Sequence, residues 1–100
     1  MIKHIVTWKL KEEAEGNTKA ENAKKIKESL EALKDKIDVL KAIEVGINFN
    51  DSSQAYDVVL YSEFDSVEDL NTYQNHPDHV KAGIFIKAVV TDRIVVDYEV

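Results

Sequence analysis

The residues best suited to chemistry are the three histidines, His4, His76 and His79. The unperturbed pKa of imidazole, about 6.5, lies near neutral pH, so the ring can both accept and return a proton. Cysteine is absent, which excludes thiolate catalysis, disulfides and cysteine-ligated metals. The sequence has no phosphate-binding loop, nucleotide fingerprint or serine nucleophile elbow. These residue types therefore favour proton transfer.

Two of the histidines stand close together in the segment His76-Pro77-Asp78-His79. Pro77 suits the first position of a helix, which places His79 in the first helical turn. A helix N-terminus disfavours the imidazolium form, and a neutral imidazole is suited to remove a proton from an activated methylene group. The structural alternative is that His76 and His79 only cap a break between two helices.

His4 has its own structural alternative. It alternates with Ile2, Val6 and Trp8, and a lone imidazole on such an apolar face is more often a hydrogen-bonded core residue than a catalyst.

A metal site is a further alternative, because His4 and the segment 76–79 together offer histidines and a carboxylate. The proline fixes the backbone there, however, and side chains three apart across a helix start need not converge. We therefore expect no metal and no cofactor.

Hydrophobic periodicity predicts the elements that must position these side chains. Alternation from Ile2 to Lys9 is typical of a strand, and Thr18-Lys19-Ala20-Glu21 is a capping box that starts a helix. Ser66 is an N-cap, and the residue before a proline disfavours helical angles. The pattern predicts strands over 2–9, 39–49, 56–64 and 94–100, with helices from Thr18 to about Lys36, from Ser66 to the His76-Pro77 break, and from Pro77 to about Val89.

In the last predicted helix, His79, Gly83, Ile86 and Val90 fall on one stripe, which we expect to face inward. Glycine lowers helix stability by about 1 kcal/mol relative to alanine, so Gly83 indicates a close contact or a cavity beside His79. We expect most aromatic residues to pack in the core and one or two to line an apolar pocket. The aromatic residues in question are Trp8, Tyr56, Phe64, Phe85 and Tyr98.

The predicted order is strand, helix, strand, strand, helices, strand. It is the split βαβ arrangement of ferredoxin-like α+β folds, an antiparallel four-stranded sheet with helices on one face. The other sheet face would then expose more apolar area than a small monomer should leave in water. We therefore expect a homodimer that packs two sheets face to face. The residues expected on that face are Ile5, Val59, Tyr61, Val95, Ile43, Val45 and Ile47.

Length and composition set outer limits on these expectations. The 100 residues fit a single domain, residues 1–100. The formal net charge of −6 argues against a nucleic-acid partner, which needs basic surface. No apolar run approaches membrane-spanning length, and Met1-Ile2-Lys3-His4 lacks a signal-peptide apolar region. We therefore expect a cytoplasmic protein that does not bind membranes.

Stretches spread over almost the whole chain match a known family in its own order. They are Ile2-Lys3-His4-Ile5-Val6, Glu44-Val45-Gly46, Tyr56-Asp57-Val58-Val59-Leu60, Ser62-Glu63-Phe64, Tyr73-Gln74-Asn75-His76-Pro77-Asp78-His79 and Val95-Val96-Asp97-Tyr98. With them the chain resembles the stress-responsive A/B barrel (Dabb) domain family, within the dimeric α+β barrel superfamily. The resemblance implies a ferredoxin-like protomer, a homodimeric barrel formed by two sheets, and a C-terminal strand that reaches toward the partner.

The resemblance also implies candidate roles. Many members of this family are known only as stress-associated or uncharacterised proteins. One branch resembles polyketide cyclases, which close a poly-β-keto chain by aldol condensation without a cofactor, in a pocket between helices and sheet of one protomer. Its working residues correspond here to Tyr73, His79 and His4. By this resemblance His79 is a general base, Tyr73 donates a hydrogen bond to the developing oxyanion, and His4 orients the reacting compound.

Two classes of function therefore stay open. The first is a stress-associated protein that binds a small apolar or keto compound without turnover. The second is a cofactor-independent cyclase or lyase-type enzyme. A cofactor-free monooxygenase is a less favoured third class, which rests on fold analogy with sister families. The residues expected to contact the ligand are Trp8, Phe64, His76, Gly83 and Phe85.

Overall fold

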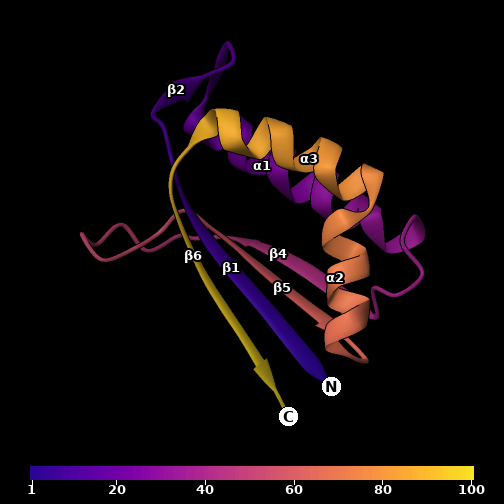
Figure 1. Ribbon diagram of the computed structural model, residues 1–100. Helices are drawn as coiled ribbons and strands as arrows, with labels where there is room; N and C mark the ends of the chain where they lie inside the picture. The colour runs from indigo at the N-terminus through magenta and orange to yellow at the C-terminus, as the bar shows by residue number, and fades with distance from the viewer.

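A four-stranded antiparallel sheet carries helices on one face in the computed structural model, which describes residues 1–100 (Figure 1). The sheet order is β4-β5-β1-β6, and a separate small hairpin pairs β2 with β3. The elements are β1 (Ile2–Leu10), β2 (Glu13–Ala14), β3 (Asn17–Thr18), α1 (Lys19–Glu31), η1 (Ala32–Asp35), β4 (Ala42–Ile47), β5 (Val58–Phe64), α2 (Val67–Asn75), α3 (Pro77–Val89) and β6 (Val90–Glu99). This order confirms the predicted ferredoxin-like α+β fold.

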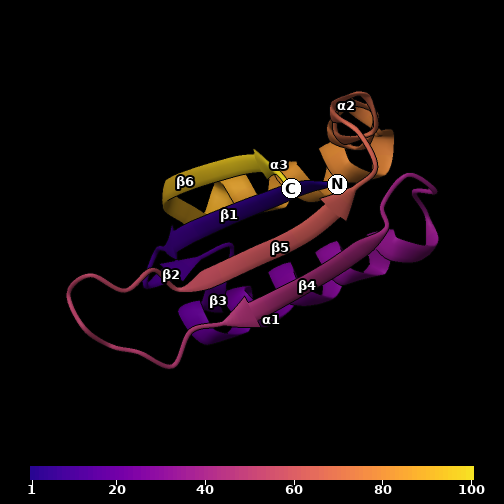
Figure 2. The same cartoon turned by 90° about the horizontal axis from the view of Figure 1, so that it is seen from below.

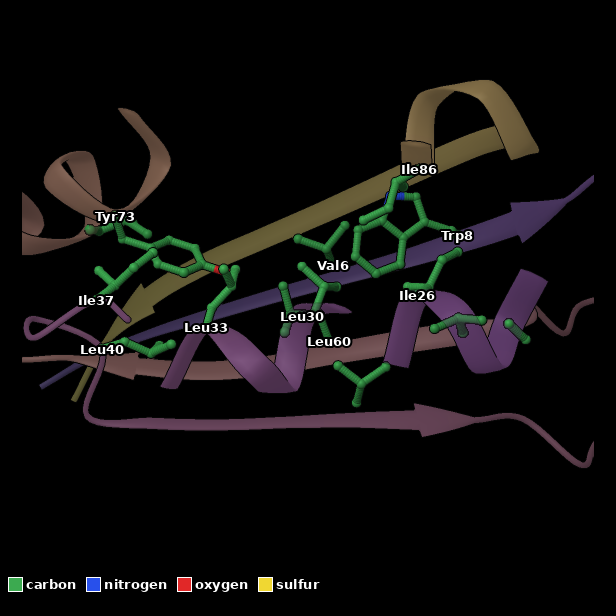
Figure 3. Close-up of a cluster of buried hydrophobic side chains, with 14 of the residues drawn as sticks. Val6, Trp8, Ile26, Leu30, Leu33, Ile37, Leu40, Leu60, Tyr73 and Ile86 are labelled. Carbon is green, nitrogen blue, oxygen red and sulfur yellow. The ribbon is translucent and has the colours of Figure 1, made fainter. Parts of the chain in front are cut away.

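The core lies between the sheet and a single layer of helices. Figure 2 shows the sheet from its uncovered side, with α1 behind β4 and α3 behind β1 and β6. In the core, Ile26 and Leu30 of α1 pack with Val6 of β1 and Leu60 of β5 (Figure 3), and all four side chains are buried. The alternation along β1 creates this layer, because every second residue from Ile2 points toward the helices.

The helix starts follow the capping residues that the sequence predicts. The Thr18 hydroxyl accepts a hydrogen bond from the Glu21 N–H at 3.2 Å, and the Glu21 carboxylate accepts one from the Thr18 N–H at 2.9 Å. The Ser66 hydroxyl accepts a hydrogen bond from the Asp69 N–H at 3.1 Å. Each contact satisfies a backbone donor that the first helical turn leaves free.

None of the helices has the length and apolarity to span a lipid bilayer.

Some elements differ in extent from the prediction. The α1 helix ends at Glu31, and the 3₁₀ turn Ala32–Asp35 takes the place of its predicted last turn. The β2–β3 hairpin was not predicted. Its turn residues Glu15 and Gly16 have φ values of 53° and 77°, as a tight hairpin turn with positive φ at both central positions requires.

The uncovered sheet face differs from the prediction in four residues. Residues directly opposite each other in an antiparallel pair share a face. Val45 is opposite Leu60 and is only 1% exposed, so β4 turns this set of side chains toward the helices. Val95 is opposite Val6 and faces the same way. The predicted placement of Ile43, Val45, Ile47 and Val95 on the uncovered face is therefore wrong.

The uncovered face is nevertheless apolar. Ile5, Val59 and Tyr61 lie on it as predicted, since they alternate with buried residues of β1 and β5. Side chains of β6 complete the patch, because Val96 is opposite Ile5. We call this surface the open-face patch, and its residues are Ile5, Val59, Tyr61, Ile94, Val96 and Tyr98.

Candidate functional site

A cavity of about 270 Å³ lies between α3 and the helix-facing side of the sheet. Its apolar lining includes Val6, Trp8, Leu30, Leu60 and Ile86, which Figure 3 shows together in the core. Ligand pockets usually occupy roughly 300–1,000 Å³. This cavity lies just below that range, which suits a short compound.

One stripe of α3 forms a wall of this cavity. His79, Gly83 and Ile86 of α3 line it, together with Val90, the first residue of β6, so all four residues that the spacing predicts to face inward reach the cavity. A Cβ atom placed on Gly83 would meet nothing within 4 Å. Gly83 therefore makes room for a cavity and not for a close helix contact.

The break between α2 and α3 sets the position of His79. The His76 ring caps α3, since its Nδ1 accepts a hydrogen bond from the Asp78 N–H at 3.1 Å. His79 follows in the first turn, where its Nδ1 lies 3.1 Å from the carbonyl oxygen of Gln74. A carbonyl oxygen only accepts, so Nδ1 carries the proton and Nε2 of the neutral ring is left as an acceptor.

The surroundings of His79 keep its ring neutral. Burial lowers the pKa of His79 below its ordinary value, because imidazolium loses hydration there. The hydrogen bond to Gln74 acts in the opposite direction, while positive charge on His4, Arg93 and His76 lowers the pKa of His79 further. A neutral ring with a free Nε2 is the form that a general base needs.

His4 is held by a carboxylate from the neighbouring strand. Its Nδ1 lies 2.5 Å from Oδ1 of Asp97, which stands directly opposite it on β6. The His4 side chain is 2% exposed, whereas that of Asp97 is 41% exposed. In the neutral ring, Nδ1 donates to the carboxylate, and the second nitrogen, Nε2, has no partner in the protein. His4 also lines the cavity.

Tyr73 lies against the His79 ring and near that of His4. Its ring centroid is 4.5 Å from that of His79 and 6.5 Å from that of His4. The residue is fully buried and its hydroxyl has no hydrogen-bond partner. Burial raises the pKa of this hydroxyl, so it stays a protonated donor. Tyr73 supports the His79 ring by contact but does not line the cavity.

Only some of the residues predicted to contact a ligand line the cavity. Trp8 and Gly83 line the cavity, whereas Phe64, His76 and Phe85 do not. Phe64 packs against Tyr73 at a centroid distance of 4.9 Å, and His76 is the α3 cap. Phe85 lines a different hollow, between α1 and α3. No three histidine, aspartate or glutamate side chains gather where they could hold a metal ion.

Sequence reasoning missed Asp97, Lys87 and Arg93 as site residues. Lys87 and Arg93 line the cavity, and Asp97 holds His4. The signal for the two β6 residues was their even spacing, which puts 93, 95 and 97 on one face of a strand. Only the pairing with β1 shows that this face is the one turned toward the helices.

A family model named Stress responsive A/B Barrel Domain (Dabb) matches residues 2–100. No curated protein matches the sequence.

Solved structures similar to this chain share the fold. A dimeric protein of unknown function with a ferredoxin-like fold from Bacteroides fragilis is 40% identical, with a TM-score of 0.88, and the match covers 99% of this chain and 95% of that chain. A dimeric ferredoxin-like protein of unknown function from Thermobifida fusca is 24% identical, with a TM-score of 0.83 and coverage of 99% and 90%. The hydroxynitrile lyase from Passiflora edulis is 17% identical, with a TM-score of 0.80 and coverage of 97% and 90%. At these lower identities the likeness concerns the fold alone.

Gly83→Ala tests whether the space beside Gly83 is open and how much this glycine destabilises α3. Because the new methyl group meets open space, the variant should gain about 1 kcal/mol of helix stability, which raises the midpoint of thermal unfolding by roughly 4–8 °C. Gly83→Leu should fill the cavity and exclude small ligands. Calorimetry measures the first effect, and a lower midpoint for Gly83→Ala would contradict an open space at this position.

The lowered pKa of His79 has a consequence for stability. The unfolded chain binds a proton at a pKa of about 6.5, before the folded His79 does. Stability is therefore lost as the pH falls from that value through the folded-state pKa. NMR titration should place the pKa of His79 below 6.5. In urea unfolding, the free energy of unfolding should fall less at acid pH in His79→Gln than in the wild-type protein. A His79 pKa at or above 6.5 would be incompatible with this burial.

Proposed function

This chain belongs to the stress-responsive A/B barrel (Dabb) domain family, and we propose that it binds a small carbonyl compound in the α3 cavity and removes a proton from the carbon beside the carbonyl. No cofactor takes part in this reaction as we propose it. The observation that carries the proposal is that His4 and His79 share one small apolar cavity, each with Nδ1 engaged and Nε2 unpartnered.

His79 is the base in this proposal. Its Nε2 takes the proton, and the electron pair of the broken C–H bond moves into the enolate, so that the carbonyl oxygen becomes an oxyanion. Burial supports this role, since it favours the neutral ring before transfer. His4, held by Asp97, orients the compound with its free nitrogen.

We assign stabilisation of the oxyanion to Tyr73. Its hydroxyl is one of two buried side-chain polar atoms without a partner, and such a group gains a full hydrogen bond when an acceptor reaches it. Its raised pKa keeps the proton available for donation. Tyr73 does not line the cavity, so this role requires its side chain to shift toward the cavity when the compound binds.

The enolate can end in two ways. In the cyclase-like outcome, the enolate carbon attacks a second carbonyl of the same molecule, so that a C–C bond forms, the π bond of that carbonyl breaks, and its oxygen takes the proton from Nε2 of His79. In the other outcome the proton returns to the carbon, which is simple exchange. The cavity of about 270 Å³ restricts either outcome to a short compound.

We also propose that the chain is a homodimer built through the open-face patch and the C-terminal strand. The exposed apolar side chains of that face support this, with Val96 and Tyr98 at 52% and 42% exposure. The dimeric B. fragilis protein, at 40% identity, gives further support.

Deuterium exchange tests the reaction. In D₂O the protein should accelerate exchange of the protons beside the carbonyl of 2-hexanone, as followed by ¹H NMR. The rate should rise with pH through the lowered pKa of His79 and then level off, because the neutral ring is the base. His79→Gln should lower the rate by about 10²–10⁴-fold. His76→Asn keeps a capping side chain for α3 and should keep the rate. Binding of 2-hexanone without exchange would contradict the base, and absence of both would contradict the whole proposal.

Sedimentation velocity tests the dimer. The protein should sediment as a dimer at micromolar concentration, and Val96→Glu should convert it to monomer by burying a charge in the patch. Ile84→Glu makes the same change at an exposed position of α3, on the helix side, and should leave the dimer intact. A monomeric wild-type protein would refute this assembly.

A further inference from the structure

The cavity has polar side chains at both ends and apolar ones between them. His4 precedes Trp8 by four residues on β1, and His79 precedes Lys87 by eight on α3. At about 3.3 Å per strand residue and 1.5 Å per helix residue, these separations are about 13 Å and 12 Å. The histidines therefore mark one end, and Trp8, Lys87 and Arg93 mark the other.

Arg93 is the principal charge at this second end. It is the only arginine in the chain, stands directly opposite Trp8 on β6, and lines the cavity while being exposed to solvent. It makes no ion pair and no side-chain hydrogen bond within the chain. In a protein with 19 acidic residues and a net charge of −6, an arginine without an acidic partner is available to a ligand.

The acids nearest to Arg93 along β6 are otherwise placed. Asp97 is engaged with His4. Asp92 is opposite Lys9, a residue of the uncovered sheet side. Lys87, the second cation of the cavity, also makes no ion pair. The solvent-facing end of the cavity thus carries two positive charges and no acid among its lining residues.

From this arrangement, and resting on the proposed function, we propose that the compound is an oxo acid whose carboxylate binds the Arg93 guanidinium while its carbonyl lies at His79 and His4. The planar guanidinium fork matches a carboxylate with two parallel hydrogen bonds. The last turn of α3, which carries Lys87, presents its negative dipole end here. This end opposes a phosphate dianion more strongly than a single carboxylate charge.

The apolar middle of the cavity sets the spacing between the two groups. Val6, Leu30, Leu60 and Ile86 line it and offer contact to methylene groups but no hydrogen bond. The arginine stem shortens the distance of about 12 Å between the two ends. A chain of a few methylene groups between carbonyl and carboxylate, as in 5-oxohexanoate, fits both this span and the volume of the cavity.

A matched pair of ligands tests the carboxylate. The dissociation constants of 5-oxohexanoate and 5-oxohexanamide are measured by NMR, through the ring signals of His79. The acid should bind the wild-type protein about tenfold more tightly or better. Arg93→Met keeps the aliphatic stem and should make the two affinities equal, while the affinity of the amide stays unchanged. Lys81→Met removes a cation of α3 that does not line the cavity and should keep the preference.

The outcomes separate this inference from the proposed function. Equal affinities in the wild-type protein, or a preference that survives Arg93→Met, would overturn the proposed binding of a carboxylate by Arg93. Exchange of 2-hexanone would be unaffected by that result. If neither compound moves the His79 signals and 2-hexanone does not exchange, the proposed function fails as well. Unchanged amide binding in Arg93→Met shows that the variant is folded.

Discussion

The pairing of β6 with β1 is the constraint on which the rest of the molecule depends. A buried imidazole is costly without a partner, and this register supplies one by placing Asp97 opposite His4. The same register places Arg93 opposite Trp8 at the far end of the cavity and turns Val96 to the uncovered face. A shift by one residue would reverse every side chain of β6. The contact between Asp97 and His4, the charged end of the cavity and the open-face patch therefore all depend on this one register.

The helix side of the site depends on a different device, the break between α2 and α3. Pro77 ends one helix and starts the next, so the carbonyl of Gln74 is free to accept from His79. Gly83 then leaves open the space that this ring faces along α3. Sheet and helix thus each supply one imidazole with the same nitrogen engaged, and both rings lie near the ring of Tyr73.

The sequence was sufficient for what local periodicity determines. The bounds of α3, the capping residues Thr18 and Ser66, and the inward stripe through Gly83 all follow from side-chain chemistry within a few residues. Strand faces did not follow. The run Ile94-Val95-Val96 is apolar on both faces, so alternation cannot say which side turns inward, and pairing across the sheet decides it. Asp97 and Arg93 were missed for this reason.

The central claim is that His4 and His79 present the same free nitrogen, Nε2, to one cavity. A long-range ¹H–¹⁵N correlation spectrum of the three histidines, recorded at about pH 8, shows which nitrogen of each ring carries the proton. The account predicts the Nδ1–H tautomer for His4 and His79, which donate to Asp97 and Gln74. It predicts the Nε2–H tautomer for His76, whose Nδ1 accepts from Asp78. An Nε2–H tautomer at His4 or His79 would contradict the account, because the nitrogen assigned to the ligand would already carry a proton.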